Sequence, residues 1–273
     1  MNTTGKISII SEKQRVLYTL LFIGTLVLYF FSLYQLKLEF KGGWENVLKA
    51  LSFAKRMLLH MDLSDWKDVL TAAMESISIA VLATIISATL AFFVSFAAAS
   101  NVSLRVVSNL CKAVAAVVRA VPTLIWTLIF VAYLGLGPFP GVLGLFFHSF
   151  AYLVKAFSQS IEEVKEGNIE ALKATGASWV QTMAKGVYPP ITTAVISWTA
   201  LRFEFNLGMS SILGFVGAGG IGMELSNTMR IFDFEKAGFV VLIIFLMSFS
   251  VEMLFHKLKL NVDKCIVKDS SNS

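Results

Sequence analysis

The chain has 273 residues, of which 56% are hydrophobic and 15% are charged, and its mean hydropathy is +0.73. This apolar share is well above that of an ordinary soluble domain, so we expect an integral membrane protein. The formal charge of +5 is less informative than the positions of the basic residues, because those positions predict which loops stay in the cytoplasm.

Six apolar runs approach the roughly 20 helical residues that a bilayer core requires. The third run is interrupted by Pro122, and the fifth carries charge. We therefore predict an all-α integral membrane protein, a bundle of six transmembrane helices. The predicted spans are Val16–Leu36, Ile77–Ala99, Val117–Gly135, Val142–Phe157, Ile191–Leu207 and Phe239–Phe255.

The first run follows basic residues, as a signal peptide would, but its apolar stretch is too long and no small-residue cleavage site follows it. We expect a retained helix over residues 16–36, preceded by a cytoplasmic N-terminus of residues 1–15. Residues 37–76 are expected to form an extracytoplasmic segment with two surface helices. These helices are Trp44–Leu59 and Ser64–Met74, the second running on into the next span.

Basic residues are frequent in the segments that lie inside if both termini are cytoplasmic. The segment from Lys37 to Asp68 is the exception, because it is predicted to lie outside and still carries several basic residues. Residues 77–257 are expected to hold the other five spans, and residues 258–273 a cytoplasmic tail. The arrangement predicts a multi-pass membrane protein with both termini in the cytoplasm.

The cysteines and histidines do not predict a metal centre or a disulfide framework. Cys111 and Cys265 fall on the predicted cytoplasmic side, where thiols stay reduced. His60, His148 and His256 lie in different segments without the spacing of metal ligands, which favours surface or packing roles.

The segment of residues 160–190 between the fourth and fifth spans is too polar for lipid and too regularly patterned for a flexible loop. Gly176 divides two short amphipathic stretches, because a residue without Cβ can take the left-handed conformation that turns one helix into the next. Pro189 and Pro190 suit the first turn of the following helix. The pattern predicts a helix–turn–helix under the membrane.

This segment resembles the "EAA" signature of binding-protein-dependent ABC import permeases, although an amphipathic loop of another polytopic protein can contain similar residues. The matching positions are Glu170, Ala171, Gly176, Ala177, Ser178 and Pro189. The chain departs from the signature at Leu172, where a second alanine is usual, and at Gly186 and Tyr188, where aliphatic residues are usual. The resemblance implies a coupling segment that docks on an ATPase through Glu170, Ala171, Gly176, Ala177 and Ser178.

Two membrane stretches resemble phosphonate permeases in particular, and the resemblance covers roughly Asp62 to the C-terminus. The first, from Arg119 to Ser149, has an Arg-Ala-Val-Pro start, a Gly-Leu-Gly-Pro-Phe turn and a histidine in the next helix. The second, from Arg202 to Gly222, has an Arg-Phe-Glu-x-Asn stretch and a Val-Gly-Ala-Gly-Gly-Ile-Gly turn. Leu207 and Gly208 stand where a basic residue is usual, which leaves the ligand open.

Arg202 is expected roughly 16 Å into the membrane, at 1.5 Å per residue from Ile191. Charges at such depth face a bundle interior or a watery pathway, so Arg202 and Glu204 either join helices or contact the transported solute. Arg202 and Asn206 share a helix face, whereas Glu204 is expected to have a partner on another helix. Candidate pathway residues are Arg119, Pro122, Arg202, Glu204 and Asn206, although Arg119 can also mark the inner interface by snorkelling.

A glycine cluster breaks the apolar pattern beyond the fifth span. It contains Gly214 and the candidate gate residues Gly217, Gly219, Gly220 and Gly222. No Rossmann strand precedes the cluster, so a nucleotide site is not expected. Irregular backbone is tolerated at membrane depth only where protein or water covers it, which suggests a turn at the outer mouth.

The sequence lacks a Walker phosphate loop, a nucleophile elbow and zinc spacing, so no catalytic site and no bound cofactor are expected in this chain. The resemblance implies the MetI-like permease subunit of an ATP-driven importer for phosphonate, located in the bacterial cytoplasmic membrane. Its expected partners are ATPase subunits that bind ATP and Mg²⁺, an extracytoplasmic binding protein, a second permease copy and membrane lipid, but no nucleic acid. Open alternatives are import of phosphate, phosphite, methionine or another small solute, an ion-coupled secondary transporter, and an integral membrane enzyme.

Overall fold

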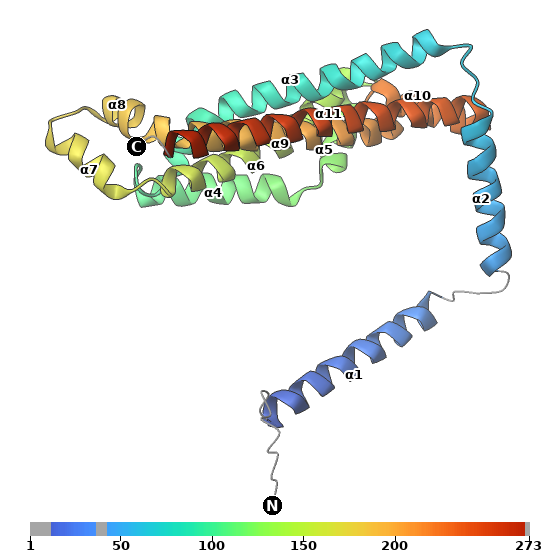
Figure 1. The fold of residues 1–273 in the computed structure, drawn as a ribbon, viewed down its shortest axis with the longest axis horizontal. Coiled ribbons are helices and arrows are strands. Elements are labelled where there is room, and N and C mark those ends of the chain that lie inside the picture. Colours follow the sequence, from blue (N-terminus) through green and yellow to red (C-terminus); the bar gives the residue numbers. More distant parts are fainter. Residues whose placement is uncertain (1–11, 37–42, 271–273) are drawn as a thin grey trace, which may run out of the picture. The chain divides into compact units, whose positions relative to one another are not determined.

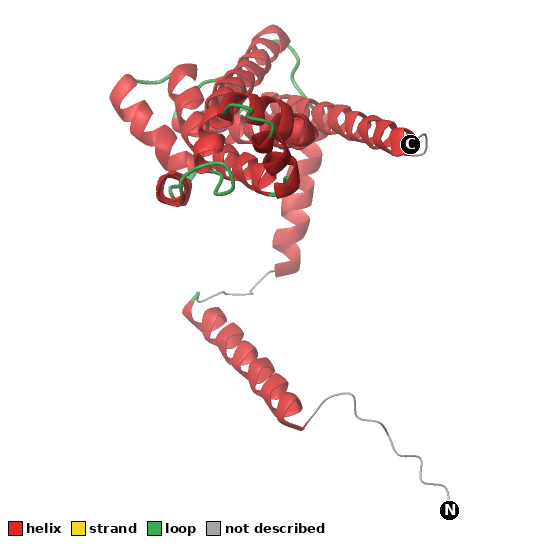
Figure 2. Cartoon of the chain, turned by 90° about the vertical axis from the view of Figure 1, so that its left-hand side faces the viewer, coloured by secondary structure: helices red, strands yellow, loops and turns green. Residues whose placement is uncertain are grey.

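The computed structural model describes residues 12–36 and 43–270, with side chains left undescribed for residues 12, 256 and 258–270. Most of the predicted N-terminal segment, part of the outer segment and the last three residues therefore lie outside the described residues. All secondary structure in the described ranges is helical (Figure 2). The chain divides into two units, residues 1–54 and 55–273.

The first unit contains α1 (Glu12–Gln35), and α2 (Gly43–Leu59) runs across the boundary into the second unit. In the second unit the long helices α3, α6, α9 and α11 run lengthwise in one bundle, with α7 and α8 at one end (Figure 1). The helices of this unit are α3 (Trp66–Ala98), α4 (Arg105–Ala120), α5 (Thr123–Leu134), α6 (Pro138–Glu162), α7 (Glu166–Ala174), α8 (Trp179–Thr182), α9 (Tyr188–Leu213), α10 (Gly220–Arg230) and α11 (Phe234–Ser270).

Four described segments are single helices long and apolar enough to cross a membrane: Lys13–Gln35, Trp66–Ala98, Pro138–Glu162 and Phe234–Phe255. Two further pairs pass the same test together, α4 with α5 across a bend of 78° and Trp179–Val216 with α10 across a bend of 41°. Counting each bent pair as one span gives six, in agreement with the predicted number.

The helices differ from the predicted spans mainly at their ends. The surface helix predicted at Ser64–Met74 begins at Trp66 and, as predicted, runs on into the second span as the single helix α3. The third span is two helices that meet at Val121 and Pro122, because proline lacks the N–H that would continue the first helix. The helix α11 runs on to Ser270, through most of the segment expected as a tail.

Small side chains allow α3 to lie close to its neighbours. Buried alanine and serine residues recur every three or four positions along one face of α3, a pattern typical of membrane helix interfaces. They are Ala73, Ser76, Ala80, Ala83, Ser87, Ala91, Ser95 and Ala98. Ser87 Oγ also donates to the Phe146 carbonyl of α6 at 3.2 Å, which joins the two helices.

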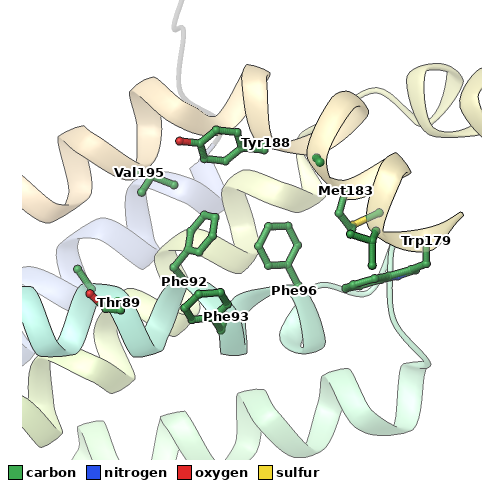
Figure 3. Close-up of a pocket in the computed structure, with 11 residues that line it drawn as sticks. Thr89, Phe92, Phe93, Phe96, Trp179, Met183, Tyr188 and Val195 are labelled. Atoms are coloured by element: carbon green, nitrogen blue, oxygen red, sulfur yellow. The ribbon is translucent and has the colours of Figure 1, made fainter. Parts of the chain in front are cut away.

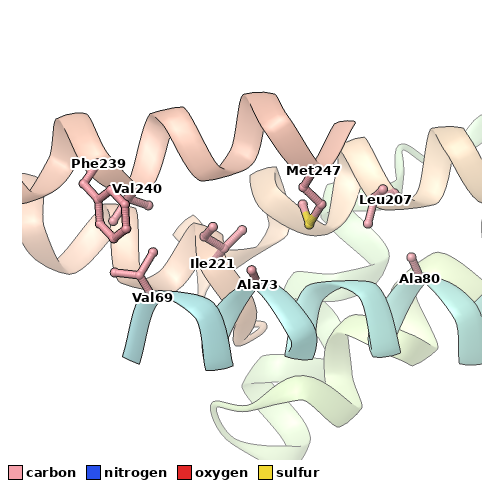
Figure 4. Close-up of a cluster of buried hydrophobic side chains, with 8 residues drawn as sticks. All are labelled: Val69, Ala73, Ala80, Leu207, Ile221, Phe239, Val240 and Met247. Atoms are coloured by element: carbon pink, nitrogen blue, oxygen red, sulfur yellow. The ribbon is translucent and has the colours of Figure 1, made fainter. Parts of the chain in front are cut away.

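One apolar cluster joins α3, α9, α10 and α11 (Figure 4). Val69 and Ala80 of α3 contribute together with Leu207 of α9, Ile221 of α10 and Val240 of α11, all with at most 1% of their surface exposed. Beside this cluster Lys236 Nζ pairs with Asp65 and Glu224 at 2.9 Å each. The start of α11 is therefore tied to both α3 and α10.

Candidate functional site

A buried polar network lies where α3, α6 and α9 meet in the interior of the bundle. Ser149 Oγ of α6 donates to Asn206 Oδ1 at 2.8 Å, and Asn206 Nδ2 donates to Thr84 Oγ1 of α3 at 2.9 Å. Asn206, Ser149 and Thr84 are 0%, 0% and 3% exposed. Buried polar groups in a membrane protein need such partners, since no water or lipid can replace them. The network therefore fixes the positions of three spans relative to one another.

Arg202 extends this network toward the partly accessible face of α6. Its Nε donates to Ser149 Oγ at 2.8 Å, and Nη2 lies 2.6 Å from His148 Nδ1. The guanidinium also lies 4.2 Å from the Phe205 ring centre and 5.1 Å from that of Tyr152. Arg202 is only 3% exposed, so in this structure its charge is held by polar and aromatic side chains of α6 and α9.

The predicted shared face of Arg202 and Asn206 is confirmed, because both residues bond to Ser149. His148 has a larger role than the packing role expected from sequence, since it adjoins Arg202. The clue lay in the phosphonate-permease motif, which contains a histidine in this helix. The partner expected for Glu204 on another helix is not found among the described residues, and Glu204 is only half-buried.

Arg119 and Pro122 take no part in the hydrogen bonds of this network. Pro122 stands at the break between α4 and α5 and caps the start of α5. Arg119, in the last turn of α4, lines a separate cavity between α4 and α6. The five pathway candidates are thus divided: Arg202 and Asn206 share one network, Arg119 lies in another cavity, Pro122 forms a helix break, and Glu204 takes part in neither.

The glycine cluster forms the turn between α9 and α10. Gly217, Gly219 and Gly220 have φ values of +88°, +74° and +69°, a region that side chains with a Cβ rarely adopt. Gly137 N, in the turn between α5 and α6, donates to Gly217 O at 2.9 Å. Gly222 packs against the Ser211 carbonyl so closely that a Cβ would overlap it. The cluster therefore joins the turn between α9 and α10 to the turn between α5 and α6.

Residues 160–190 form the predicted helix–turn–helix. Gly176 separates α7 from α8 with a φ of +81°, and a Cβ there would meet nothing within 4 Å. Ser178 begins α8 with a capping box, in which its side chain and that of Gln181 each accept from the other's backbone N–H. Ile169 is the buried anchor of α7. The residues expected to dock an ATPase are exposed, except for the half-buried Ala177: Glu170, Ala171, Gly176 and Ser178.

An apolar groove of about 780 Å³ lies between α3 and the segment that runs from α8 into α9 (Figure 3). Phe92, Phe96, Trp179 and Tyr188 line it with aliphatic neighbours. Trp179 Nε1 donates to the Val102 carbonyl at 3.2 Å, which attaches α8 to the turn after α3. The lining has no charged side chain, so the groove does not suit an oxyanion.

Comparison with known families decides the class of protein. Residues 91–262 match the family described as "Binding-protein-dependent transport system inner membrane component". The chain belongs to this family. Membership makes it an inner membrane component of a transport system, as its apolar helices and coupling segment predict.

Relatives and a solved structure agree with membership in this transport family. The "Phosphate-import permease protein PhnE" of Mycolicibacterium smegmatis is 37% identical over 188 residues, 68% of this chain and 35% of that protein. The "Phosphite transport system permease protein PtxC" of Stutzerimonas stutzeri is 40% identical over 129 residues, 47% of each chain. The chain thus spans about a third to a half of these two relatives. An inward-facing MetNI methionine ABC transporter chain has the same fold, with a TM-score of 0.55, 18% identity, and coverage of 72% of this chain and 99% of that one.

Two departures from the family's EAA signature are neighbours in space. A Cβ on Gly186 would lie 2.7 Å from Leu172 Cδ1, closer than the two atoms can approach. Leu172 replaces the smaller residue usual in the signature, and Gly186 replaces a larger one. The two changes therefore compensate in volume, and the pairing keeps α7 packed on the π-helical turn Met183–Val187.

Proposed function

We propose that this chain is the membrane-spanning permease subunit of an ATP-driven importer for phosphonate or a closely related phosphorus oxyanion. The exposed helix–turn–helix of α7 and α8 is the observation that carries the importer class. It extends from the end of the bundle, presents Glu170 and Gly176 to the surface, and is anchored through Ile169 and Trp179. A rigid but exposed element suits docking on a soluble ATPase.

The oxyanion assignment is supported by the names of the relatives and by the charge of the bundle interior. Arg202 offers five N–H donors, and two of its nitrogens are engaged with Ser149 and His148. His148 is partly accessible, so a small oxyanion that displaces it would meet the guanidinium in a setting of low dielectric. Arg202 with His148 is the proposed contact for the solute, and Asn206 holds Arg202's helix in place.

The complete transporter in this proposal contains two copies of this chain, two ATPase subunits and an extracytoplasmic binding protein. This chain carries no catalytic site, and ATP with Mg²⁺ is bound by the partner ATPase. The glycine turn of Gly217, Gly219, Gly220 and Gly222 forms the gate at the outer side. Both termini lie in the cytoplasm, on the same side as α7 and α8.

The test is ATP-dependent uptake of radiolabelled methylphosphonate into vesicles that contain this chain with its neighbouring ATPase and binding protein. Wild type is compared with Glu170→Ala, Gly176→Ala and Gly176→Trp. Gly176→Ala measures backbone strain alone, and the tryptophan adds bulk on the docking face. We expect saturable uptake in wild type and loss in Gly176→Trp that exceeds the loss in Gly176→Ala.

The outcomes separate the class from the ligand. ATPase activity stimulated by phosphate, phosphite or methionine but not by methylphosphonate would retain the importer class and replace the ligand. Uptake driven by an ion gradient without any ATPase would establish a secondary transporter instead. Failure of the ATPase to bind the wild-type chain would refute the importer class.

A further inference from the structure

A second cluster of cationic side chains lies between α4 and α6 and shares no residue with the Arg202 network. A cavity of about 310 Å³ opens there, and its polar lining consists of Lys112, Arg119, Lys155, Ser158, Gln159 and Glu162. Ala115, Ala116 and Ala151 form the rest of the wall, and their small side chains leave the space open. The volume is well above the ~30 Å³ share of one water molecule, so the cavity accommodates a small hydrated oxyanion.

The single carboxylate in this cavity is already occupied. Glu162 Oε1 accepts from Lys112 Nζ at 2.6 Å, from Ser100 N at 2.7 Å and from Ser100 Oγ at 2.8 Å. Arg119 and Lys155 have no ion pair among the described residues. Three cations therefore face one carboxylate, and two of them lack a counter-charge. Like charges close together destabilise each other, and an anion between them removes that cost.

The cavity continues a polar line along α6 that starts at the Arg202 network. His148, Tyr152, Lys155, Gln159 and Glu162 are spaced four and three residues apart, which places them on one face of the helix. All five are partly or fully accessible, whereas Val154, Phe157 and Ile161 on the other side are buried. The line runs from the bundle interior to the end of α6 that leads into α7.

We propose that Arg119 and Lys155, supported by Gln159, form an oxyanion-binding site in the cavity between α4 and α6, which extends to the end of α6 that leads into the coupling segment. Its ligand is a phosphate or phosphonate group, either the transported solute on its way out or the headgroup of an anionic phospholipid. The planar Arg119 guanidinium binds two oxygens side by side, and the flexible Lys155 ammonium adds a point charge at the accessible side. The identity of the solute rests on the proposed function.

The experiment measures protection of a cysteine placed in the cavity. Ala116→Cys, at a lining residue with no assigned contact to the ligand, is introduced with Cys111→Ser and Cys265→Ser into the full chain bound to its ATPase, reconstituted in nanodiscs and labelled with a hydrophilic maleimide. The first arm uses neutral phosphatidylcholine nanodiscs and adds inorganic phosphate or methylphosphonate, with chloride at equal ionic strength as the control. At ten times the dissociation constant, occupancy slows labelling about tenfold.

A second arm contains no free oxyanion and replaces part of the neutral lipid with phosphatidylglycerol. Protection in the first arm assigns the site to the solute, and protection in the second arm alone assigns it to a lipid headgroup. Arg119→Gln with Lys155→Gln is expected to abolish protection, whereas Lys155→Arg and the matched control Arg105→Gln, an exposed arginine of α4 outside the cavity, keep it.

Lack of protection in both arms would overturn the proposal, as would protection that survives the double variant. Copurification of the ATPase checks that the double variant is folded. Labelling requires no transport, so the two proposals fail separately. Protection without methylphosphonate uptake would keep the site and refute the transport assignment, whereas uptake without protection would keep the assignment and remove the site.

Discussion

Replacing Asn206 with alanine tests whether the polar network fixes the three-helix contact. The change removes two hydrogen bonds, one with Ser149 of α6 and one with Thr84 of α3. Interhelical hydrogen bonds in membrane proteins average about 0.6 kcal/mol and reach about 1.7 kcal/mol. We therefore expect the free energy of unfolding to fall by about 1–3 kcal/mol, measured by SDS titration of the chain in mixed micelles.

A double-mutant cycle isolates the contact between α3 and α9. Thr84→Val removes the acceptor of Asn206, but it also removes the bond from Thr84 Oγ1 to the Ala80 carbonyl at 2.7 Å. Thr89→Val is the matched control, because Thr89 Oγ1 makes the same local bond to the Ile85 carbonyl at 2.8 Å and Thr89 is exposed. The difference between the two valine variants reports the contact with Asn206.

The expected coupling energy between Asn206→Ala and Thr84→Val is about 0.5–1.5 kcal/mol, as for other residues in one network. Thr89→Val should show no coupling with Asn206→Ala. The reasoning is refuted if Thr84→Val and Thr89→Val destabilise equally, or if the two changes at the network add without coupling. In that case apolar packing alone would hold the helices together.

Gly144→Ala would place a methyl group where it overlaps Thr127 of α5, so we expect the free energy of unfolding, measured by thermal unfolding, to fall by about 1–3 kcal/mol. The control Gly24→Ala, where a Cβ meets nothing within 4 Å, should be neutral or stabilising. Equal stability of the two variants would contradict the close approach of α5 and α6. Ser178→Ala removes the capping box and should weaken α8 by about 1 kcal/mol, seen as faster hydrogen exchange over residues 178–182; unchanged exchange would mean that the cap is dispensable. Lys236→Met removes two partly exposed ion pairs and should lower the free energy of unfolding by about 1 kcal/mol or less. This loss should shrink in 1 M salt if it is electrostatic and persist if it comes from packing.

Hydropathy predicted the number of spans because a helix that crosses a bilayer must be long and apolar, and both properties can be read from a short window of sequence. The ends of helices were harder to predict. The part of α3 that precedes the apolar run was predicted from its amphipathic pattern, but the separate helix α10, which begins at Gly220, was not. Amphipathic extensions pack on protein rather than lipid, so their composition is mixed and the hydropathy signal is weak.

The candidate site was also predicted only in part. The spacing of Arg202 and Asn206 predicted a shared face, since helical periodicity is a local property. His148 could not be assigned to that site by spacing, because its contact with Arg202 spans 54 positions along the chain. The contact between Leu172 and Gly186 could not be predicted for the same reason. The two departures from the signature lie apart in the sequence, and only the folded structure shows that they pack against each other.

Glu204 bears on the proposed pairing of two copies. It is half-buried, its neighbours Leu201 and Phe205 on α9 are exposed, and no partner for it is found within the described parts of the chain. A carboxylate in the middle of a span is not stable against lipid, so in the membrane this face of α9 has to meet protein or water. The two-copy arrangement of the proposed importer would supply such cover through a water-filled pathway between the copies that solvates Glu204.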